Sequence, residues 1–220
     1  MNKACIGKRI FHYKVIDSTQ KEIYRRVERR DILSGDLIIA DIQTNAIGTH
    51  GRRWYTDREN NIAFSLYVDL GENIKILDGI TIRIAEILKE IFKVIYDVDL
   101  TIKEPNDLIL NRKKIGGILT ETKVCGNIVK YIVLGIGINT NQLVFDENIE
   151  NIASSIKKET KIIIDNNKII KEFLNRFAEE IDIRIGEKLW ELDCYSLDKD
   201  LNALGWEKIF TMIMKHTEML

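Results

Sequence analysis

The chain has 220 residues, which is enough for one substantial hydrophobic core and a small appendage. Its 33 Lys and Arg nearly balance its 34 Asp and Glu, and the formal net charge of −1 argues against a nucleic-acid binder that depends on an overall basic field. Three widely spaced cysteines form no CxxC pair, and no apolar run suits a signal peptide or a membrane span, so we expect a cytoplasmic protein.

The first part of the chain predicts two strands separated by a helix. Residues Phe11–Ile16 have the pattern of a short strand, and Asp36–Ile42 that of a buried one. Between them, Asp17, Ser18 and Thr19 precede a helical run and can cap its free N–H groups. The same N–H groups favour an anion or a carbonyl oxygen of a ligand, so capping and ligand binding are both compatible with this motif.

The polar segment Gln43–Asn60 shows no helical or strand periodicity, and a loop of this length in a compact domain is typical of a functional lid. Its glycines allow close approach to a ligand, and its arginines can pair with phosphate or carboxylate. Trp54 can stack on a planar ring, or it can fasten the loop to the core. His50 has no accompanying metal-ligand set, and the sequence defines no metal site.

The remaining pattern mixes strands and helices without regular alternation, which favours an α+β fold. Asn61–Leu70 and Lys130–Asn139 are predicted strands, and the second contains Gly135 and Gly137, which indicate a bulge or close backbone approach by a ligand. The predicted amphipathic helices are Ile76–Val98 and Asn167–Leu189.

The segment Lys103–Glu121 predicts a β-hairpin around a polar turn at residues 111–113. Pro105 fixes the entry angle, and Asn106 and Asp107 suit a tight turn. The second strand starts at Lys114 and the paired glycines Gly116 and Gly117. These residues can gather an amide, a carboxylate and an ammonium around one anionic ligand, or they can simply form turns.

Four motifs in order give the chain its resemblance to a known family. They are Asp17-Ser18-Thr19, Gln43 through Trp54, the KEPND…K…GG segment 103–121, and Gly135–Asn139. Over roughly residues 10–190 the chain resembles the catalytic domain of biotin–protein ligases, which activate biotin with ATP and attach it to a lysine of a biotin carboxyl carrier protein. The resemblance implies an α+β fold with a mixed, mostly antiparallel sheet flanked by helices, as in class II aminoacyl-tRNA synthetases. We expect these helices to lie on one side of the sheet.

The resemblance also implies the site residues. Lys114 and Asp107 are the expected catalytic residues, with Lys114 also contacting the biotin carboxylate. The other expected biotin-binding residues are Ser18, Thr19, Gln43, Gly48, Gly116 and Gly117. The expected ATP-binding residues are Gly51, Arg52, Arg53, Trp54, Asn106 and Asn139. The implied substrates and cofactors are biotin, ATP and Mg²⁺, and homodimers are common in the family.

The sequence departs from the family pattern at one loop and at both ends. The usual GRGRRG reads Ala46-Ile47-Gly48-Thr49-His50-Gly51, which removes three arginines, although Arg52 and Arg53 follow. The short segment before residue 10 leaves no room for a DNA-binding winged helix, so we expect no DNA partner. We expect a catalytic domain at residues 1–190 and a tail at 191–220 without a recognisable SH3-like domain.

Three other functions remain to be weighed. The altered loop and tail allow a relative that binds biotin or its adenylate with little or no catalysis. A lipoate or octanoate ligase of the same fold would carry an RRxSGGG-type motif, which is absent here. A nucleic-acid-binding role rests on the arginines of residues 25–30, which suit the solvated face of a helix.

Overall fold

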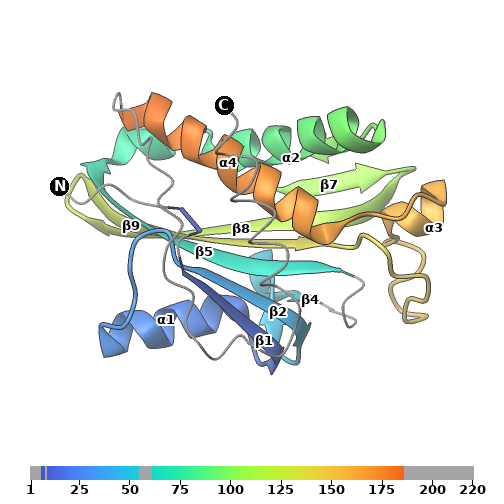
Figure 1. Cartoon of the computed structure of the whole chain (residues 1–220), viewed down its shortest axis with the longest axis horizontal. Helices are drawn as coiled ribbons and strands as arrows, with labels where there is room; N and C mark the ends of the chain where they lie inside the picture. The colour runs from blue at the N-terminus through green and yellow to red at the C-terminus, as the bar shows by residue number, and fades with distance from the viewer. Residues whose placement is uncertain (1–5, 8, 55–60, 186–220) are drawn as a thin grey trace, which may run out of the picture.

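Seven strands form one continuous sheet in the order β1-β2-β5-β9-β8-β7-β6 (Figure 1). The structure is a computed structural model that describes residues 6–7, 9–54 and 61–185. The strands are β1 (Ile10–Ile16), β2 (Leu37–Gln43), β5 (Ile62–Asn73), β6 (Thr101–Lys103), β7 (Asp107–Leu110), β8 (Lys113–Cys125) and β9 (Ile128–Ile138). The helices are α1 (Thr19–Arg29), α2 (Ile80–Tyr96), α3 (Ile156–Thr160) and α4 (Asn166–Ile185).

Only β1 and β2 pair in parallel, and every other neighbouring pair in this sheet is antiparallel. Two parallel strands need a crossover connection, and α1 supplies it between β1 and β2. The expected mixed, mostly antiparallel α+β fold is therefore confirmed.

The two faces of the sheet carry different helices. On β5, Phe64, Leu66 and Val68 point into the main core with α2 and α4, whereas Tyr67 points to a smaller core under α1. Successive side chains of a strand alternate between faces, so one strand serves both layers. Figure 1 shows α2 and α4 above the sheet and α1 below it. The expectation that the helices lie on one side is wrong for α1.

The helix boundaries differ from the predicted ones for local reasons. The helix predicted at Ile76–Val98 begins later, because Ile74–Leu77 forms a 3-10 turn and Gly79, at φ +67°, separates it from α2. The helix predicted at Asn167–Leu189 is α4, and its predicted residues beyond 185 lie outside the described residues. The predicted tail at 191–220 lies outside them too. Within the described parts of the chain, no helix has the length and apolar character needed to cross a bilayer.

The predicted hairpin is confirmed as β7 and β8. Leu110 pairs with Lys113, so a two-residue turn joins the strands, and both turn residues, Asn111 and Arg112, have positive φ. Two positive φ values are the mark of a type I′ turn, whose twist matches that of paired strands. The short strand β6, which the sequence did not predict, extends the sheet beyond β7.

The start of α1 is held by its own polar motif. Ser18 is the N-cap, and its hydroxyl oxygen accepts a hydrogen bond from the N–H of Lys21. Asp17 accepts from the N–H of Ser18 at 2.8 Å and forms an ion pair with Arg25, at 2.7 Å and 3.0 Å. The hydrogen bonds from Arg25 lower the pKa of Asp17 from 3.8 to about 2. This ion pair fixes the first turn of α1 against the end of β1.

We predict that Phe173→Ala lowers the free energy of unfolding by about 3–5 kcal/mol, because it empties a fully buried site. The Phe173 ring packs against Phe64 and Phe177, with centroids 5.7 Å and 5.6 Å away. Urea denaturation measures the change. The control Ile163→Ala, at a side chain that is 69% exposed, should change stability by less than about 0.5 kcal/mol. Equal effects of the two variants would contradict the position of the core.

We predict that Asp17→Asn flattens the acid dependence of stability. A carboxyl whose pKa is lowered on folding stabilises the protein above its unfolded pKa, and that contribution is lost as the pH falls from about 4 towards 2. The variant should therefore be less stable than wild type at pH 6 and lose less stability on acidification. Urea midpoints at several pH values test this, and Arg25→Gln should reproduce the effect. An unchanged pH profile for Asp17→Asn would show that the ion pair contributes nothing.

Candidate functional site

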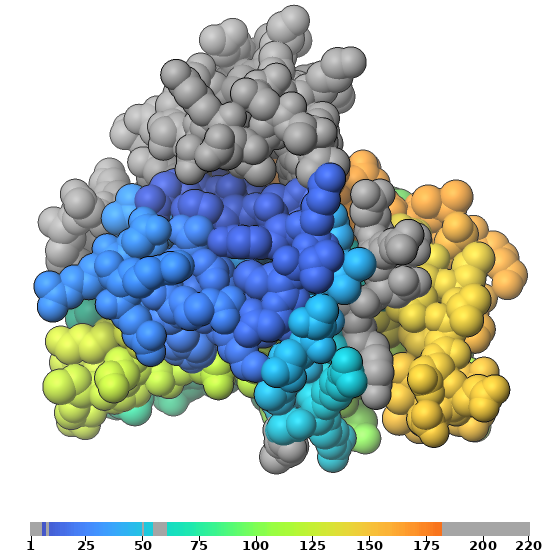
Figure 2. Space-filling model, turned by 90° about the horizontal axis from the view of Figure 1, so that it is seen from below, coloured from blue at the N-terminus to red at the C-terminus, as the bar shows by residue number. Residues whose placement is uncertain are grey.

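A cavity opens on the α1 face of the sheet, between the start of α1 and the segment 46–54. That segment forms a small hairpin from β3 (Ala46–Ile47) and β4 (Arg53–Trp54), joined by a 3-10 turn at Thr49–Gly51. The interpretation of residues 43–60 as lacking strand structure is therefore wrong for these four residues and for Gln43, which ends β2. Seen from the α1 side, the light-blue hairpin lies between the blue N-terminal elements and the yellow segment after β9 (Figure 2).

The cavity lining combines polar, apolar and charged groups in separate places. Its polar members are Ser18, Thr19, Gln20, Gln43, Thr49, Ser65 and Asn106. Its larger apolar members are Ile47, Trp54, Phe64, Ile118, Leu119 and Ile136, and small residues complete it at Ala46, Gly48, Gly117, Gly135 and Gly137. Lys114 is the only charged side chain among the described residues of this lining.

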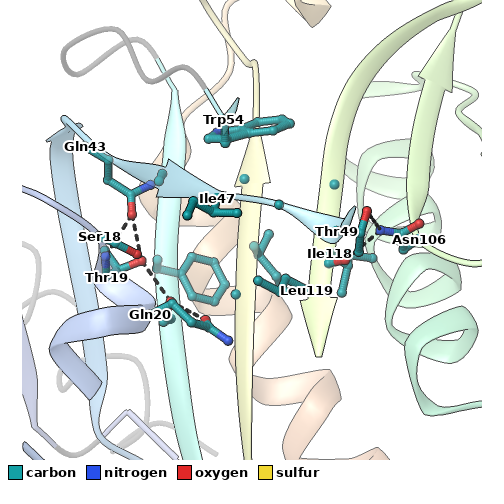
Figure 3. A pocket seen from close by; sticks show the side chains of 18 of the residues that line it. Ser18, Thr19, Gln20, Gln43, Ile47, Thr49, Trp54, Asn106, Ile118 and Leu119 are labelled. Carbon is teal, nitrogen blue, oxygen red and sulfur yellow. Dashed lines mark hydrogen bonds between the residues drawn. The ribbon is translucent and has the colours of Figure 1, made fainter. Parts of the chain in front are cut away.

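Hydrogen-bonded side chains form the polar end of the cavity (Figure 3). The Thr19 backbone N–H donates to Gln43 Oε1 at 2.8 Å, and the Thr19 hydroxyl lies 3.1 Å from the same oxygen. The Thr19 hydroxyl also lies 2.8 Å from that of Ser65, which donates to Gln20 Oε1 at 2.9 Å. The residues of this hydrogen-bonded series come from α1, β2 and β5, so the fold holds the polar end of the cavity in place.

The floor of the cavity is made of small residues in register on two strands. Gly137 and Gly117 are direct neighbours across β9 and β8, the Trp54 indole lies over both, and Ala63 of β5 continues the row beside Gly137, outside the lining. A Cβ atom on Gly137 would lie 2.5 Å from the indole, so only glycine leaves room for it. Gly135 similarly makes room for Gln20, whose Oε1 would be 2.7 Å from a Cβ atom there.

A β-bulge directs Lys114 into the cavity. Leu108 pairs with Gly116, but the next residue, Ile109, pairs with Lys114, so Ile115 is an extra residue on β8. Without the bulge, strict alternation would place Lys114 on the same side as Gly116, facing the core. With it, Ile115 is fully buried in the core, while Lys114 Nζ lies within 3.4 Å of a Cβ position on Gly117, on the cavity side.

Asp107 is the ion-pair partner of Lys114. Its Oδ1 lies 2.6 Å from Lys114 Nζ, and the ammonium also lies 5.8 Å from the centroid of the Trp54 ring. Asp107 pairs with Gly117, which places it on the same row as the cavity floor. The pair is therefore positioned to meet an anionic group that enters from the Trp54 side.

Asn106, which directly precedes β7, links the β7–β8 hairpin to the 3-10 turn between β3 and β4. Its Nδ2 donates to the carbonyl of Ile118 at 3.0 Å and lies 3.4 Å from the Thr49 hydroxyl. Thr49 stands where the family pattern has an arginine. The contact therefore closes one side of the cavity without a positive charge.

The structure brings together eight of the predicted site residues. In the cavity lining are Ser18, Thr19, Gln43, Gly48, Trp54, Asn106, Lys114 and Gly117. The predicted residues outside the lining are Gly51, Arg52, Arg53, Asp107, Gly116 and Asn139.

Three of these outside positions have clear structural partners. A Cβ atom on Gly116 would meet the Gly137 carbonyl at 3.0 Å and Leu108 at 3.2 Å, so glycine there serves strand packing. Asn139 is buried and donates to the carbonyl of Ser154 at 3.1 Å, which ties the end of β9 to the segment before α3. Arg53 is exposed and donates to the carbonyl of Thr44 at 3.2 Å.

Sequence reasoning missed Gln20 and Ser65. Gln20 follows the capping motif directly and was assigned only to the helix, while Ser65 is one small polar residue in an apolar strand. A polar residue on the cavity face of a buried strand is a usable signal, because its hydrogen bonds must be satisfied. The β9 glycines were interpreted as a bulge or as close approach by a ligand, whereas the groups that lie closely against them in the structure are the protein's own side chains of Gln20 and Trp54.

No group of three or more His, Cys, Asp or Glu side chains that could hold a metal ion occurs in residues 6–7, 9–54 and 61–185. A magnesium ion that arrives with a nucleotide needs fewer protein ligands, since phosphate oxygens and water fill most of its coordination sphere. One carboxylate at this site, that of Asp107, is compatible with that mode of binding.

Known proteins with similar sequences are biotin ligases. The bifunctional ligase/repressor BirA of Bacillus spizizenii is 30% identical over 176 residues, which cover 79% of this chain and 54% of the relative. The biotin–[acetyl-CoA-carboxylase] ligase of Mycobacterium tuberculosis is 25% identical over 181 residues, covering 76% of this chain and 60% of the relative. The chain thus spans a little over half the length of the curated relatives it matches.

Solved structures agree with this similarity. The biotin protein ligase of Aquifex aeolicus in complex with biotin and ATP has a TM-score of 0.65 and 26% identity, covering 82% of this chain and 74% of the other. The Leishmania major biotin protein ligase in complex with biotinyl-5-AMP, at 20% identity and a TM-score of 0.62, shows the same fold.

The model of the biotin/lipoate A/B protein ligase family matches residues 12–139, which is more than half of the chain and includes every motif of the cavity described above. The chain belongs to the biotin/lipoate A/B protein ligase family.

Proposed function

We propose that this chain is a biotin–protein ligase, which activates biotin with ATP to biotinyl-5′-AMP and then transfers biotin to a lysine of a carrier protein. The order of chemical groups along the cavity supports this proposal most directly. In Figure 3, the polar side chains of Ser18, Thr19, Gln20 and Gln43 lie at one end of the cavity, Ile47 and Leu119 lie in the middle, and Thr49 and Asn106 lie at the other end. The one ammonium of the described lining, that of Lys114, lies beside Gly117.

Biotin presents a complementary order of groups. Its cyclic urea has two N–H donors and one carbonyl acceptor, which suit Ser18, Thr19 and Gln43. Its thioether ring and aliphatic chain suit apolar neighbours such as Ile47 and Leu119. Its terminal carboxylate then reaches Lys114, the one charged group of the described lining.

In the first step, a carboxylate oxygen of biotin attacks the α-phosphorus of ATP, the bond to the β-phosphate oxygen breaks, and pyrophosphate leaves. Two anions must approach each other, so the site must neutralise charge and hold the reactants in line. Lys114 is placed for this role, and Asp107 holds its ammonium in position at 2.6 Å. The magnesium that accompanies ATP supplies further charge neutralisation at the phosphates.

In the second step, the amine of a carrier lysine attacks the carbonyl carbon of the mixed anhydride, an amide forms, and AMP leaves with the electron pair of the broken bond. This step needs mainly positioning and protection from water. The hairpin β3–β4 covers the cavity and brings Trp54 over the glycine floor. We assign the covering role to this hairpin.

The nucleotide is the less defined half of the proposed site. We place the adenine next to Trp54 and the phosphates near Asn106 and Lys114, which line the cavity together. Gly51, Arg52 and Arg53 are exposed at the end of the hairpin, where two guanidinium groups can meet phosphates from the solvent side. Asn139 is included on the family pattern, although its amide bonds to Ser154 in this structure.

The acceptor is proposed to be a biotin carboxyl carrier protein or a carboxylase subunit, in line with the name of the Mycobacterium tuberculosis relative. We propose a cytoplasmic location, where such carboxylases work. A homodimer remains a proposal from the family resemblance.

We predict that Lys114→Ala lowers biotin-dependent pyrophosphate release from MgATP by about 100-fold or more, because a charge that stabilises the transition state is lost. The matched control is Lys113→Ala. This neighbouring lysine points elsewhere, with its Nζ donating to the carbonyl of Glu150 at 3.0 Å, and its loss should leave the rate unchanged. Equal rates for wild type and Lys114→Ala would refute the assigned role.

The same assay with a carboxylase carrier domain separates the two half-reactions. We expect wild type to release pyrophosphate and to label the carrier lysine. Pyrophosphate release without labelling would contradict the transfer step of the proposal. Biotin binding by calorimetry without pyrophosphate release would favour a family member that binds biotin with little or no catalysis. Ile47 and Thr49, which stand at arginine positions of the family pattern, would then explain the missing activity. If the wild-type protein neither binds biotin nor releases pyrophosphate, the proposed function is refuted altogether.

A further inference from the structure

We infer that Glu121, which does not line the cavity, is a positioning residue that makes Gln20 a hydrogen-bond acceptor for a ligand N–H group. The inference rests on the proposed function, because it assigns that N–H to the urea of biotin. Gln20 is 8% exposed and lines the cavity, and its Nε2 donates to Glu121 Oε2 at 2.9 Å. The two residues are 101 positions apart in sequence and meet across α1 and β8.

The orientation of the Gln20 carboxamide follows from what its partners can do. An ionised carboxylate has no hydrogen to donate, so the Gln20 atom that faces Glu121 must be the NH₂ group. The carbonyl of Val133, 3.3 Å from the same Nε2, is also only an acceptor. The amide oxygen therefore points the other way, towards the Ser65 hydroxyl and the space above Gly135.

A second donor reinforces the acceptor role of Glu121. The Tyr24 hydroxyl donates to the same Oε2 at 2.8 Å. Burial, and then the hydrogen bond to Glu121, raise the pKa of Tyr24 well above its usual range, so this phenol keeps its hydrogen at physiological pH. Glu121 thus receives hydrogen bonds from two side chains of α1, and a reversed Gln20 amide would place a carbonyl oxygen against a carboxylate.

At the other end of this series of hydrogen bonds, the orientation of the Gln43 carboxamide is fixed in the same way. The backbone N–H of Thr19 can only donate, so the Gln43 atom that faces it must be Oε1. Between these two ends, the hydroxyls of Thr19 and Ser65 have two hydrogens for three contacts. The contacts are Thr19 to Gln43 at 3.1 Å, Thr19 to Ser65 at 2.8 Å, and Ser65 to Gln20 at 2.9 Å.

The Ser65 hydroxyl donates to Gln20 Oε1, so the remaining hydrogen is that of Thr19, whose two acceptors are Gln43 Oε1 and the Ser65 oxygen. With either acceptor, the hydrogen of Ser65 is directed to Gln20, and Gln20 donates to Glu121 and to the carbonyl of Val133. Thr19, Ser65 and Gln20 all line the cavity, and their oxygens therefore offer lone pairs to a ligand there.

A row of acceptor oxygens selects a ligand with N–H donors and disfavours one that brings a carboxylate or an ester oxygen to this end. A buried acceptor that meets another acceptor costs more than a missing hydrogen bond, because both groups have lost water. The cyclic urea of biotin has two N–H groups, so this end of the cavity fits the head of biotin and rejects a plain acyl chain. Glu121 sets this preference although it does not touch the ligand.

The test replaces Glu121 by residues that keep or lose the acceptor. Glu121→Leu frees the Gln20 amide to reverse, and we expect the biotin Kd to rise about 10-fold, with biotin KM rising equally and kcat at saturating biotin unchanged. Glu121→Gln keeps an acceptor oxygen of the same reach and should stay within about 3-fold of wild type. The affinity for MgATP should be the same in all variants.

The control Thr120→Val changes the neighbouring residue of β8, which faces α2 and contacts Thr81 at 3.0 Å, and should bind biotin normally. A second route tests Gln20 directly. Gln20→Met removes the acceptor itself, and Gln20→Met combined with Glu121→Leu should bind biotin no worse than Gln20→Met alone, because both act through one group. If Glu121→Leu does not fold, the single variant Gln20→Met still tests the acceptor, and it should also raise the biotin Kd.

The outcomes separate this inference from the proposed function. Biotin binding by wild type that Glu121→Leu and Gln20→Met leave unchanged would overturn the inference alone. Additive losses in the double variant would also overturn it, since Glu121 would then act by another path. Wild-type protein that binds no biotin would overturn the proposed function and the inference together.

Discussion

The bulge in β8 is the constraint on which the candidate site depends. Without it, Lys114 and Gly117 would face opposite sides of the sheet, because residues three apart in a regular strand do so. With one extra residue, Ile115 and Gly116 both serve the core, while Lys114 joins the row of Gly117 and Asp107. The Lys114 backbone is fixed as well, since its N–H donates to the carbonyl of Ile152 and its carbonyl accepts from Ser154. The only charge of the described lining is therefore held by main-chain hydrogen bonds.

The glycines of β8 and β9 have a matching purpose on the same face. They remove side chains from the sheet where Trp54 and Gln20 must lie flat against it, as the short distances to an added Cβ show. Glycine in a strand is unfavourable by roughly 0.5–1 kcal/mol, and the broad core under α2 and α4 on the opposite face offsets this cost. One sheet thus carries a stabilising face and a binding face, with α1 covering part of the second.

The sequence was informative where the signal is local. Ser18 as a cap and the turn at Asn111 each follow from a few neighbouring residues, and the structure agrees with both. The glycines in β9 marked positions of close approach, but the side chains that approach, Gln20 and Trp54, come from distant parts of the sequence. The bulge at Ile115 was not predictable, because its cause is a pairing register between strands rather than a residue type. The hydrogen bonds that join Ser65, Gln20 and Glu121 were missed for a similar reason, since Ser65 and Gln20 are 45 positions apart and Gln20 and Glu121 are 101 positions apart. The side of the sheet that α1 covers is also a tertiary choice, and the family resemblance gave it wrongly.

The charge balance of the cavity decides where binding energy must come from. Lys114 is already paired with Asp107 at 2.6 Å, so a ligand carboxylate exchanges one anionic partner of the ammonium for another and gains less than it would at a free cation. Ile47 and Thr49 stand at two family arginine positions and contribute no charge. Affinity for an acid must therefore depend more on the neutral end of the molecule. The acceptor oxygens of Thr19, Ser65 and Gln20 are the groups that meet this neutral end of the ligand.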